Sequence, residues 1–479
     1  MAAEVLLVNP NRMKPGVAPL ALDYLGAALE ERGFLVSFLD LCFEDDAAAA
    51  VKASRTVQSA GLIGVTIRNT DDCYLPSQDF CLERIRPIAQ ALKQLSRSPI
   101  VLGGTGFSLM PEAVLEYLGA DLGIVGDGEE ALSELAQCIA EGLDYRHIAG
   151  LVHPADNGWA RNPIRHAALD SLPLHRRRIV DSERYLREGG MGGIETKRGC
   201  DRRCIYCADP IAKGRSCRLR SPQSVADELE AMLDRGVDHL HICDSEFNLP
   251  MEHALAVCEE LSRMRLGEKL RWFTYASPVP FDRELAAAMK RAGCVGINFG
   301  VDSGDDGMLR RLARDFTSEN LRATARVCRE EQIVFMYDLL IGGPGETRQT
   351  ARRTIELMKE VSPSRVGVSA GVRIYPGTVI EAIARREGFS SDNPNLKGAI
   401  EGNENFLRPV FYLSAAMGDD PFDYLSRLVA DDARFFLPTP SADDRNYNYN
   451  DNAVLVQAIR KGYRGAFWDI LRRLAEEKS

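Results

Sequence analysis

Short apolar runs alternate with amphipathic helical patterns over the first 150 residues. Helical patterns such as 20–31 and 129–140 separate runs of strand length. The predicted strands span 4–8, 34–39, 62–67, 100–103 and 122–125. Near-continuous apolar strands that alternate with helices predict a parallel sheet covered on both faces. We therefore expect a doubly wound, Rossmann-like α/β domain over residues 1–150, with its ligand crevice at the carboxyl ends of the strands.

A second alternation begins at Gly193, after a stretch (151–192) that Pro and Gly residues interrupt and that we interpret as a linker. Helical patterns such as 222–235, 253–266 and 347–359 follow most of its strands. The predicted strands span 194–196, 239–243, 271–275, 296–301, 334–341 and 365–372. Six units are fewer than a closed (β/α)8 barrel has, so they predict a partial, open barrel over 193–390. Residues 391–479 lose the alternation, and we expect a small, mostly helical region that caps the substrate cavity.

The composition narrows the class of partner. A net charge of −10 disfavours nucleic-acid binding, because phosphate contacts need clustered Lys and Arg. No apolar run reaches the roughly 18 residues of a membrane span, and the start, 1–8, lacks the basic segment of a secretory signal. Without such a signal, the 12 cysteines predict free thiols in the cytoplasm and a metal site, in place of a disulfide framework.

Three cysteines, Cys200, Cys204 and Cys207, lie within eight residues. Thiolates are the ligands of iron–sulfur clusters, and three ligands would leave one iron open to a substrate or cofactor. Two alternatives stay open at this point. The spacing also places all three sulfurs on one helix face as core residues, and a zinc site is the other possibility. Zinc ribbons, however, bring a second Cys or His pair, which Cys217, His239 and His241 do not form.

The spacing C-x3-C-x2-C, with an aromatic residue before the last cysteine and a strand before the motif, resembles the radical S-adenosylmethionine (SAM) superfamily. This resemblance implies that Cys200, Cys204 and Cys207 hold a catalytic 4Fe–4S cluster, whose open iron chelates SAM and cleaves it to a 5′-deoxyadenosyl radical. Glycines and polar residues also follow the second, fourth and fifth strands of the barrel. By the same resemblance, the residues expected to bind SAM are Tyr206, Asp244, Glu246, Asp302, Ser303, Gly342, Gly343 and Glu346.

Two glycine-rich strand ends mark the N-terminal domain, 103–108 and 126–129. Glycines there permit close approach of a ligand, and the alternative is tight turns that such folds need anyway. No G-x-G-x-x-G follows the first strand, which argues against a dinucleotide. The layout resembles cobalamin-binding radical SAM proteins over nearly the whole chain. The cobalamin contacts that this implies are Asn9, Pro10, Arg68, Asn69, Gly103, Gly104, Gly106, Phe107, Gly126, Gly128 and Glu129.

The D-x-H-x-x-G motif of many cobalamin proteins is absent, and residues 1–146 contain no histidine. We therefore predict base-off cobalamin without an imidazole ligand from this domain. Arg68 follows the third strand, where the loop should reach under the corrin ring, and a guanidinium cannot give up its proton to coordinate cobalt. The alternative is that Arg68 pairs with Asp71 or Asp72 on a surface turn.

The resemblance favours a methyltransferase that acts on an unactivated carbon of a small molecule, with methylcobalamin as the methyl donor and flavodoxin or ferredoxin as the electron donor. A cobalamin-dependent cyclase or rearrangement enzyme that does not methylate is the main alternative. A methylthiotransferase is a weaker one, because Cys42, Cys73, Cys81 and Cys138 do not follow its expected motifs. Candidate substrate contacts are Tyr375, Tyr447, Tyr449 and Trp468. We expect neither nucleic acid nor membrane as a partner.

Overall fold

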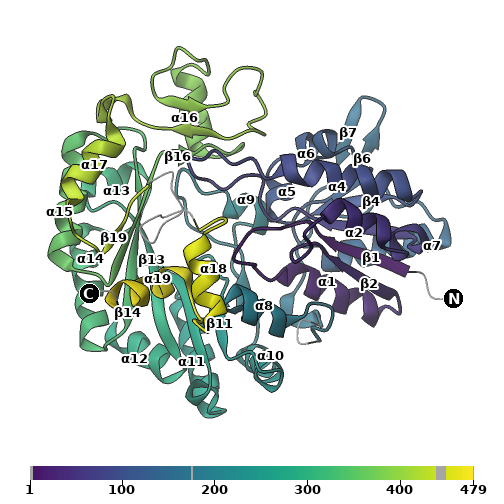
Figure 1. Ribbon diagram of the computed structural model, residues 1–479, viewed down its shortest axis with the longest axis horizontal. Coiled ribbons are helices and arrows are strands. Elements are labelled where there is room, and N and C mark those ends of the chain that lie inside the picture. Colours follow the sequence, from purple (N-terminus) through teal and green to yellow (C-terminus); the bar gives the residue numbers. More distant parts are fainter. Residues whose placement is uncertain (1–3, 174–175, 439–448, 478–479) are drawn as a thin grey trace.

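The computed structural model describes residues 4–173, 176–438 and 449–477. Two α/β bodies lie side by side, the N-terminal domain in purple and blue and the barrel in teal and green (Figure 1). The C-terminal helices, in yellow, lie against the strands of the barrel. The carboxyl ends of the strands of both sheets border one cavity, which positions the candidate site.

The N-terminal sheet has the expected doubly wound topology. Its first five strands are parallel in the order β2-β1-β3-β4-β5, and they span β1 (Glu4–Asn9), β2 (Leu35–Asp40), β3 (Leu62–Thr66), β4 (Ile100–Gly103) and β5 (Leu122–Ile124). Helices α1 (Leu20–Glu31) and α7 (Glu129–Glu141) cover one face. The other helices are α2 (Ala47–Ala53), α3 (Thr56–Ser59), α4 (Leu82–Leu95), α5 (Thr105–Leu109) and α6 (Pro111–Leu118). The order reverses between β1 and β3, so the crevice of the sheet lies where these two strands end.

The stretch that we expected to be a linker begins with a β-hairpin, β6 (Leu151–Ala155) and β7 (Gly158–Arg161). Strand β6 pairs antiparallel with β5, so the hairpin extends the N-terminal sheet past residue 150. The sequence did not predict β6 because it contains Pro154, and proline within an apolar run argues against a strand unless that strand lies near a sheet edge. A 3-10 turn, η1 (Leu169–Ser171), and α8 (Ser182–Gly189) complete the connection.

The second sheet contains the six predicted parallel strands in sequence order. They are β8 (Gly192–Ile194), β11 (His239–Ile242), β12 (Arg271–Ala276), β13 (Cys294–Asp302), β14 (Val334–Ile341) and β15 (Arg365–Ala370). The helices between and after them are α10 (Pro222–Asp234), α11 (Met251–Arg263), η2 (Leu266–Glu268), α12 (Arg283–Arg291), α13 (Asp306–Arg311), α14 (Ser318–Glu330) and α15 (Arg348–Val361). A small hairpin, β9 (Lys197–Arg198) and β10 (Arg218–Leu219), with α9 (Asp209–Lys213) between its strands, follows β8. The partial barrel is confirmed.

The C-terminal region contains more strand than the expected mostly helical cap. Strands β16 (Val372–Arg373), β18 (Val410–Tyr412) and β17 (Leu396–Gly398) form an antiparallel sheet, and β19 (Phe435–Phe436) adds a seventh parallel strand beside β15. Strands of two or three residues are too short to show a period-two pattern, which is why the sequence did not reveal them. The helices are α16 (Val379–Glu387), η3 (Ala415–Met417), α17 (Pro421–Val429), α18 (Ala453–Arg460) and α19 (Phe467–Glu476).

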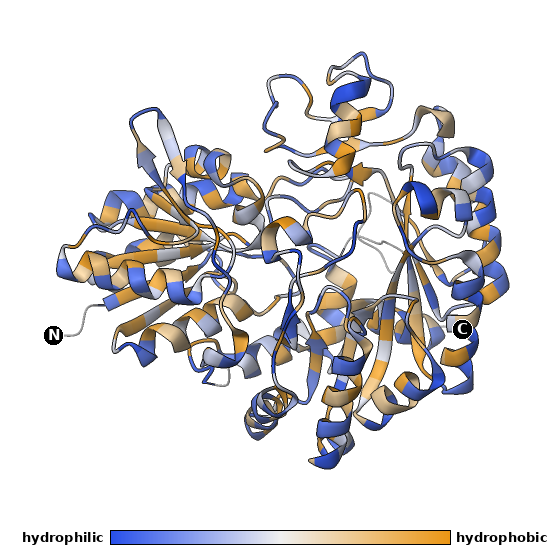
Figure 2. Ribbon diagram, turned by 180° about the vertical axis from the view of Figure 1, so that it is seen from behind, coloured by the Kyte–Doolittle hydropathy of each residue, from blue (hydrophilic) through white to orange (hydrophobic). Residues whose placement is uncertain are grey.

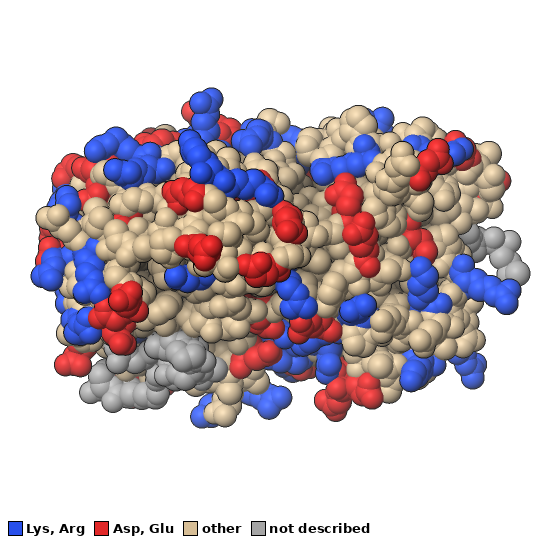
Figure 3. Space-filling view, turned by 90° about the horizontal axis from the view of Figure 1, so that it is seen from above, with Lys and Arg blue, Asp and Glu red and all other residues tan. Residues whose placement is uncertain are grey.

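Helices α18 and α19 close one end of the open barrel. Trp468 packs edge-on against Phe273 of β12, with 6.1 Å between ring centroids, and both belong to one apolar cluster with Met336 of β14. The strands of both sheets are predominantly hydrophobic, while polar residues mark the outer faces of the helices (Figure 2). On the face in Figure 3, acidic and basic side chains are interspersed. Among the described residues, no helix has the length and apolarity needed to cross a membrane.

Candidate active site between the two sheets

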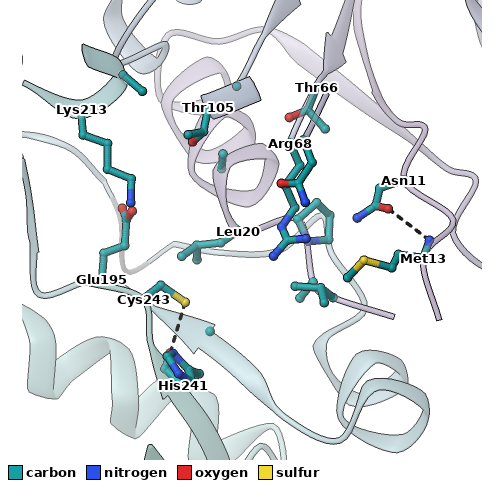
Figure 4. Close-up of a pocket in the computed structure, with 18 of the residues that line it drawn as sticks. Asn11, Met13, Leu20, Thr66, Arg68, Thr105, Glu195, Lys213, His241 and Cys243 are labelled. Carbon is teal, nitrogen blue, oxygen red and sulfur yellow. Dashed lines mark hydrogen bonds between the residues drawn. The ribbon is translucent and has the colours of Figure 1, made fainter. Parts of the chain in front are cut away.

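A cavity of about 960 Å³ lies between the two domains. Strand ends of the N-terminal sheet form one wall, and the barrel forms the other with residues such as His241, Cys243 and Tyr275 (Figure 4). Tyr275 keeps 46% of its surface accessible because its ring faces this cavity. Both sheets therefore direct their ligand-binding edges into one shared space.

Most of the residues proposed for cobalamin binding lie on the N-terminal wall, namely Asn9, Arg68, Asn69, Gly103, Gly104, Gly126, Gly128 and Glu129. Pro10, Gly106 and Phe107 are not part of the wall. Phe107 is fully buried, and its ring fills the space beside Gly123, where a Cβ atom would lie 2.1 Å from it. We therefore reassign Phe107 from ligand contact to core packing.

Glycine is required at positions 104 and 106 for a different reason from the close approach of a ligand that we expected. A Cβ atom on Gly104, whose φ is +101°, would lie 2.7 Å from the carbonyl oxygen of Ile67, and one on Gly106 would lie 3.0 Å from that of Arg68. Two loops of the protein thus approach each other closely there, which is by itself enough to require glycine at both positions. Gly103 differs, since the nearest atom to its Cβ position is Ile124 O at 3.8 Å.

This difference gives a test at two adjacent positions. Gly104→Val should clash with the backbone of residue 67 and lower the melting temperature by several degrees, about 2–4 °C per kcal/mol for a domain of this size. Gly103→Val should leave the melting temperature of the apoprotein close to the wild-type value and weaken cobalamin binding. Thermal melts and equilibrium cobalamin titration measure the two effects. Equal cobalamin affinity of Gly103→Val and wild type would contradict the placement.

An apolar slot continues from the cavity between the sheet and helices α1 and α7. Its walls are Leu7, Leu22, Leu25, Gly64 and Leu132. A Cβ atom on Gly64 would lie 3.0 Å from Leu7 Cδ2, so glycine keeps this slot open. This apolar lining suits an apolar part of a ligand that enters the cavity.

Arg68 extends into the cavity among Asn11, Met13 and Leu20 (Figure 4). Among the described residues it forms no ion pair, because Asp71 is bound by Arg373 at 2.8 Å and Asp72 accepts from Ser77. The surface-turn reading of Arg68 therefore does not hold. His241, across the cavity on β11, is the only histidine among the described residues that line it. The N-terminal wall thus offers a guanidinium and no imidazole.

The three motif cysteines lie on a loop, which excludes the reading as one face of a helix. Burial raises the pKa of the Cys200 thiol to about 11, and it also raises the pKa values of Cys204 and Cys207. Metal binding must therefore displace protons from these thiols. Among the described residues, no three His, Cys, Asp or Glu side chains converge on a point that would hold a single metal ion. Three thiols spread along a loop fit the separate corners of a 4Fe–4S cube better than a mononuclear zinc site.

Arg314, which follows α13, is the functional candidate that the sequence did not reveal. Its Nη1 donates to Cys204 Sγ at 2.9 Å, and its guanidinium lies 3.4 Å from Asp302 and 3.8 Å from Glu246. An arginine against a cluster sulfur stabilises the thiolate and tunes the cluster electrostatically. No local motif surrounds this residue, so only the fold could bring it to the cluster.

The residues proposed for SAM binding divide into two groups. Tyr206, Glu246 and Asp302 gather around Arg314; Tyr206 donates to Asp302 at 2.5 Å, and Asp302 lines the cavity with φ +61°. Burial, followed by the charge of Asp302, raises the pKa of Glu246 to about 7. These three are placed to act near the cluster.

Of the proposed SAM contacts only Asp302 lines the cavity; the five described next do not, nor do Tyr206 and Glu246. The carboxylate of Asp244 is buried against Thr196 and Lys197, with Thr196 N at 2.8 Å. Glu346 accepts from Thr350, and Ser303 lies 3.0 Å from the hydroxyl of Thr354. Gly342 packs against Leu413, and Gly343 against Leu312. These five residues shape the strand ends from beneath, so a direct contact with SAM stays a prediction.

Of the proposed substrate residues, Tyr449 and Trp468 line the cavity. Tyr375 does not, because its hydroxyl contacts Cys73 Sγ at 2.9 Å and its ring packs under Arg373. Tyr447 lies outside the described residues. Two of the four proposed substrate residues thus line the cavity, and both come from the C-terminal region.

The chain matches two protein-family models, the B12 binding domain over residues 12–136 and the radical SAM superfamily over residues 194–358. It is 32% identical to a tryptophan 2-C-methyltransferase from Streptomyces laurentii, over 97% of this chain and 95% of that protein. The radical SAM methyltransferase TsrM from Kitasatospora setae, solved with tryptophan and a SAM analogue, aligns with a TM-score of 0.91 and 34% identity, over 100% of this chain and 98% of its own. The cobalamin-dependent radical SAM enzyme OxsB shares the fold, with a TM-score of 0.67 and 19% identity, over 86% of this chain and 64% of its own.

Two sheets that face one cavity, one with a B12-binding topology and one with a three-cysteine loop, define a cobalamin-binding radical SAM enzyme. The chain belongs to the cobalamin-dependent radical SAM methyltransferases, and its cofactors are a 4Fe–4S cluster, SAM and cobalamin. The B12-binding match replaces the methylthiotransferase alternative, which would need a second cluster in that domain.

Proposed function

We propose that this enzyme methylates a ring carbon of an indole substrate, with tryptophan as the first candidate. When bound, cobalamin would relay a methyl group from SAM to the substrate, while the cluster would hold SAM. The chain itself must bind the indole, orient one carbon toward the cobalamin wall and exclude water. The similarity to tryptophan 2-C-methyltransferase along the whole chain supports this proposal.

A polar layer inside the barrel is the observation that carries the proposal. Asn298 of β13 is 4% exposed and lines the cavity. Its Nδ2 donates to Asp338 Oδ2 at 3.1 Å, which sets the orientation of the amide, and its Oδ1 has no hydrogen-bond partner. A buried acceptor without a partner costs free energy that a bound N–H donor would recover. The indole N–H and the ammonium group of tryptophan are both donors of this kind.

The surrounding side chains suit an aromatic ligand. Tyr275 of β12 stands beside Asn298 in the paired register, and His241 lies against Tyr275 with 4.8 Å between ring centroids. Burial lowers the pKa of His241 to about 4, so the imidazole is neutral at pH 7. Neutral aromatic faces next to a hydrogen-bond acceptor can hold a flat heterocycle and orient it.

Asn298→Leu removes the acceptor while keeping a similar volume. We expect kcat/KM for tryptophan to fall about 10- to 100-fold, the cost of leaving a donor unpaired. An indole analogue with sulfur in place of N–H distinguishes the two donors of tryptophan. If Asn298 binds the ring N–H, the wild-type kcat/KM for this analogue should be lower than that for tryptophan by the same factor. The Asn298→Leu substitution should then cause no further fall in kcat/KM for the analogue. Steady-state kinetics by product mass spectrometry measures both.

The control variant is Ser369→Ala, which changes another polar wall residue that has no orphaned buried acceptor. It should change kcat/KM little. Full activity of Asn298→Leu on tryptophan would contradict the substrate site. A tryptophan product without the mass of one added methylene unit would instead favour the non-methylating alternative.

We also propose that the enzyme works in the cytoplasm and receives electrons from a flavodoxin or ferredoxin. All 12 cysteines are free thiols, which supports a reducing compartment. Reduction of the reconstituted cluster by purified flavodoxin tests the donor.

A further inference from the structure

The loop with the three motif cysteines connects the two strands of a hairpin in which two arginines face each other. Strands β9 and β10 flank residues 199–217, which include all three motif cysteines. Arg198 and Arg218 stand directly opposite each other across this antiparallel pair. Like charges in that position repel, so the hairpin needs carboxylates to hold its two strands together.

The N-terminal domain supplies two of these carboxylates. Glu129 Oε1 accepts from Arg198 Nη2 at 2.7 Å, and Asp127 Oδ1 accepts from Arg198 Nη1 at 3.4 Å. Asp127 also binds Arg218, with Nη2 3.2 Å from Oδ1. A third carboxylate, that of Glu195, comes from the barrel itself and accepts from Arg198 Nε at 2.8 Å. Asp127 therefore lies between the two arginines and bridges them.

This ion cluster is buried. The side chains of Arg198 and Asp127 are 9% and 7% exposed, and that of Glu129 is 4% exposed. Arg198 and Arg218 lower the pKa of Asp127, which keeps its carboxylate charged, and the imidazole of His166 lies 3.4 Å from it. Arginine can hold three carboxylates at once because its donors form a rigid fork, which a lysine does not have.

The same short loop borders the cobalamin wall. Gly126, Asp127, Gly128 and Glu129 all line the cavity, and the loop joins β5 to α7. One four-residue segment thus contacts the space for cobalamin on one side and the cluster hairpin on the other. Any displacement of the segment moves one cofactor site relative to the other.

We infer that Arg198 is a positioning residue that, through Asp127 and Glu129, sets the place of the cluster loop relative to the cobalamin wall. The inference rests on the presence of both cofactors and does not depend on which substrate is methylated. A misplacement of about 1 Å between reacting groups can cost roughly 100-fold in rate. The clamp therefore controls how well SAM on the cluster is aligned with cobalamin.

The alternative is that these ion pairs only stabilise the protein. Arg198→Gln removes the fork while keeping a similar length, and Glu129→Gln weakens the clamp from the N-terminal side without changing the cluster hairpin. The control is Asp121→Asn, which breaks another contact of the N-terminal domain, with Lys93 at 3.0 Å, at the amino end of β5 and therefore at the opposite end of that strand from residues 126–129. A purely stabilising role predicts the same behaviour for all three variants.

The first readout is spectroscopic and uses the protein loaded with cluster and cob(II)alamin. The reduced cluster speeds the electron-spin relaxation of cob(II)alamin in a way that depends steeply on their separation. We expect Arg198→Gln and Glu129→Gln to change this relaxation enhancement at full iron and cobalamin content, and Asp121→Asn to leave it at the wild-type value. Hydrogen–deuterium exchange of residues 197–219 in the apoprotein should also rise in the two clamp variants alone.

The second readout is the formation of S-adenosylhomocysteine in a single turnover, with the cobalamin chemically reduced beforehand and no organic acceptor present; the methyl group of SAM would then pass to the reduced cobalamin, one equivalent per enzyme. The rate constant of this turnover at saturating SAM should fall about 10- to 100-fold in the clamp variants, with little change in the SAM concentration that gives half of the maximal rate. Since no organic acceptor is present, a failure of the indole assignment does not affect this result. If Arg198→Gln fails to load its cluster, Glu129→Gln decides the matter. Wild-type relaxation and wild-type rate in a fully loaded Glu129→Gln protein would overturn the inference.

Discussion

Simultaneous replacement of Cys200, Cys204 and Cys207 by alanine should remove the bound iron completely. The absorbance at about 400 nm that comes from thiolate-bound iron should disappear together with the iron. Because all three proposed thiolate ligands are removed together, we expect no partial cluster of the same type. Iron analysis and the absorption spectrum after anaerobic reconstitution measure the loss, and activity should fall below detection.

The matched control is Cys217→Ala. Cys217 belongs to the same loop, and its Sγ lies 3.7 Å from Gly199 O, but it is outside the three-cysteine motif. This variant should keep four irons and the wild-type spectrum. Four irons in the triple variant would show that the cluster assignment is wrong. Loss of iron in Cys217→Ala alone would shift the ligand set to include that residue.

Arg68→Ala should keep cobalamin bound but slow turnover about 10- to 100-fold, the range found when a group that supports a metal site is removed. In the wild-type protein, the electron paramagnetic resonance spectrum of cob(II)alamin should show no nitrogen superhyperfine splitting. The reason is that the N-terminal wall offers a guanidinium, which cannot coordinate, and no imidazole. When cobalamin is bound, Arg68 would present a fixed positive charge and no coordinating atom to it.

Arg68→His provides the positive control, since an imidazole in this place should introduce the missing splitting. Arg68→Lys keeps the charge but loses the planar fork, and it should fall between wild type and Arg68→Ala. Full activity of Arg68→Ala would mean that the guanidinium has no part in turnover. Splitting in the wild-type spectrum would show that an imidazole reaches the cobalt after all.

The sequence predicted the architecture well because the predicted strands of both sheets pair in parallel and most of them are buried on both faces. Such strands are near-continuous apolar runs, and each is followed by a helix with its own periodicity. Helix α1 begins and ends at the predicted residues, and the six predicted barrel strands all appear. The hairpin β6–β7 and the short strands β16–β19 escaped, because they are either interrupted by proline or too short to show a period.

In the candidate site, too, the residues that form a local motif could be predicted, and those whose role depends on the fold could not. A local motif suffices to propose Cys200, Cys204 and Cys207 as cluster ligands, because the three residues lie within one loop. The absence of an N-terminal histidine is likewise visible in the sequence alone. Roles that depend on direction were harder to assign. Phe107 is part of a glycine-rich motif, yet its side chain points into the core.

What the sequence by itself determined is therefore the two-domain α/β plan, the three-cysteine motif and the family resemblance, since each depends on residues close together in the chain. Only the tertiary structure decided which side chains meet across the cavity. Arg314 reaches Cys204 across 110 positions, and Arg198 reaches Glu129 across 69. The orphaned acceptor of Asn298 is equally invisible in the sequence, because a missing partner is defined only once every neighbour is in place. Long-range pairing of buried charges and acceptors is set by how the two sheets pack, and no local pattern records it.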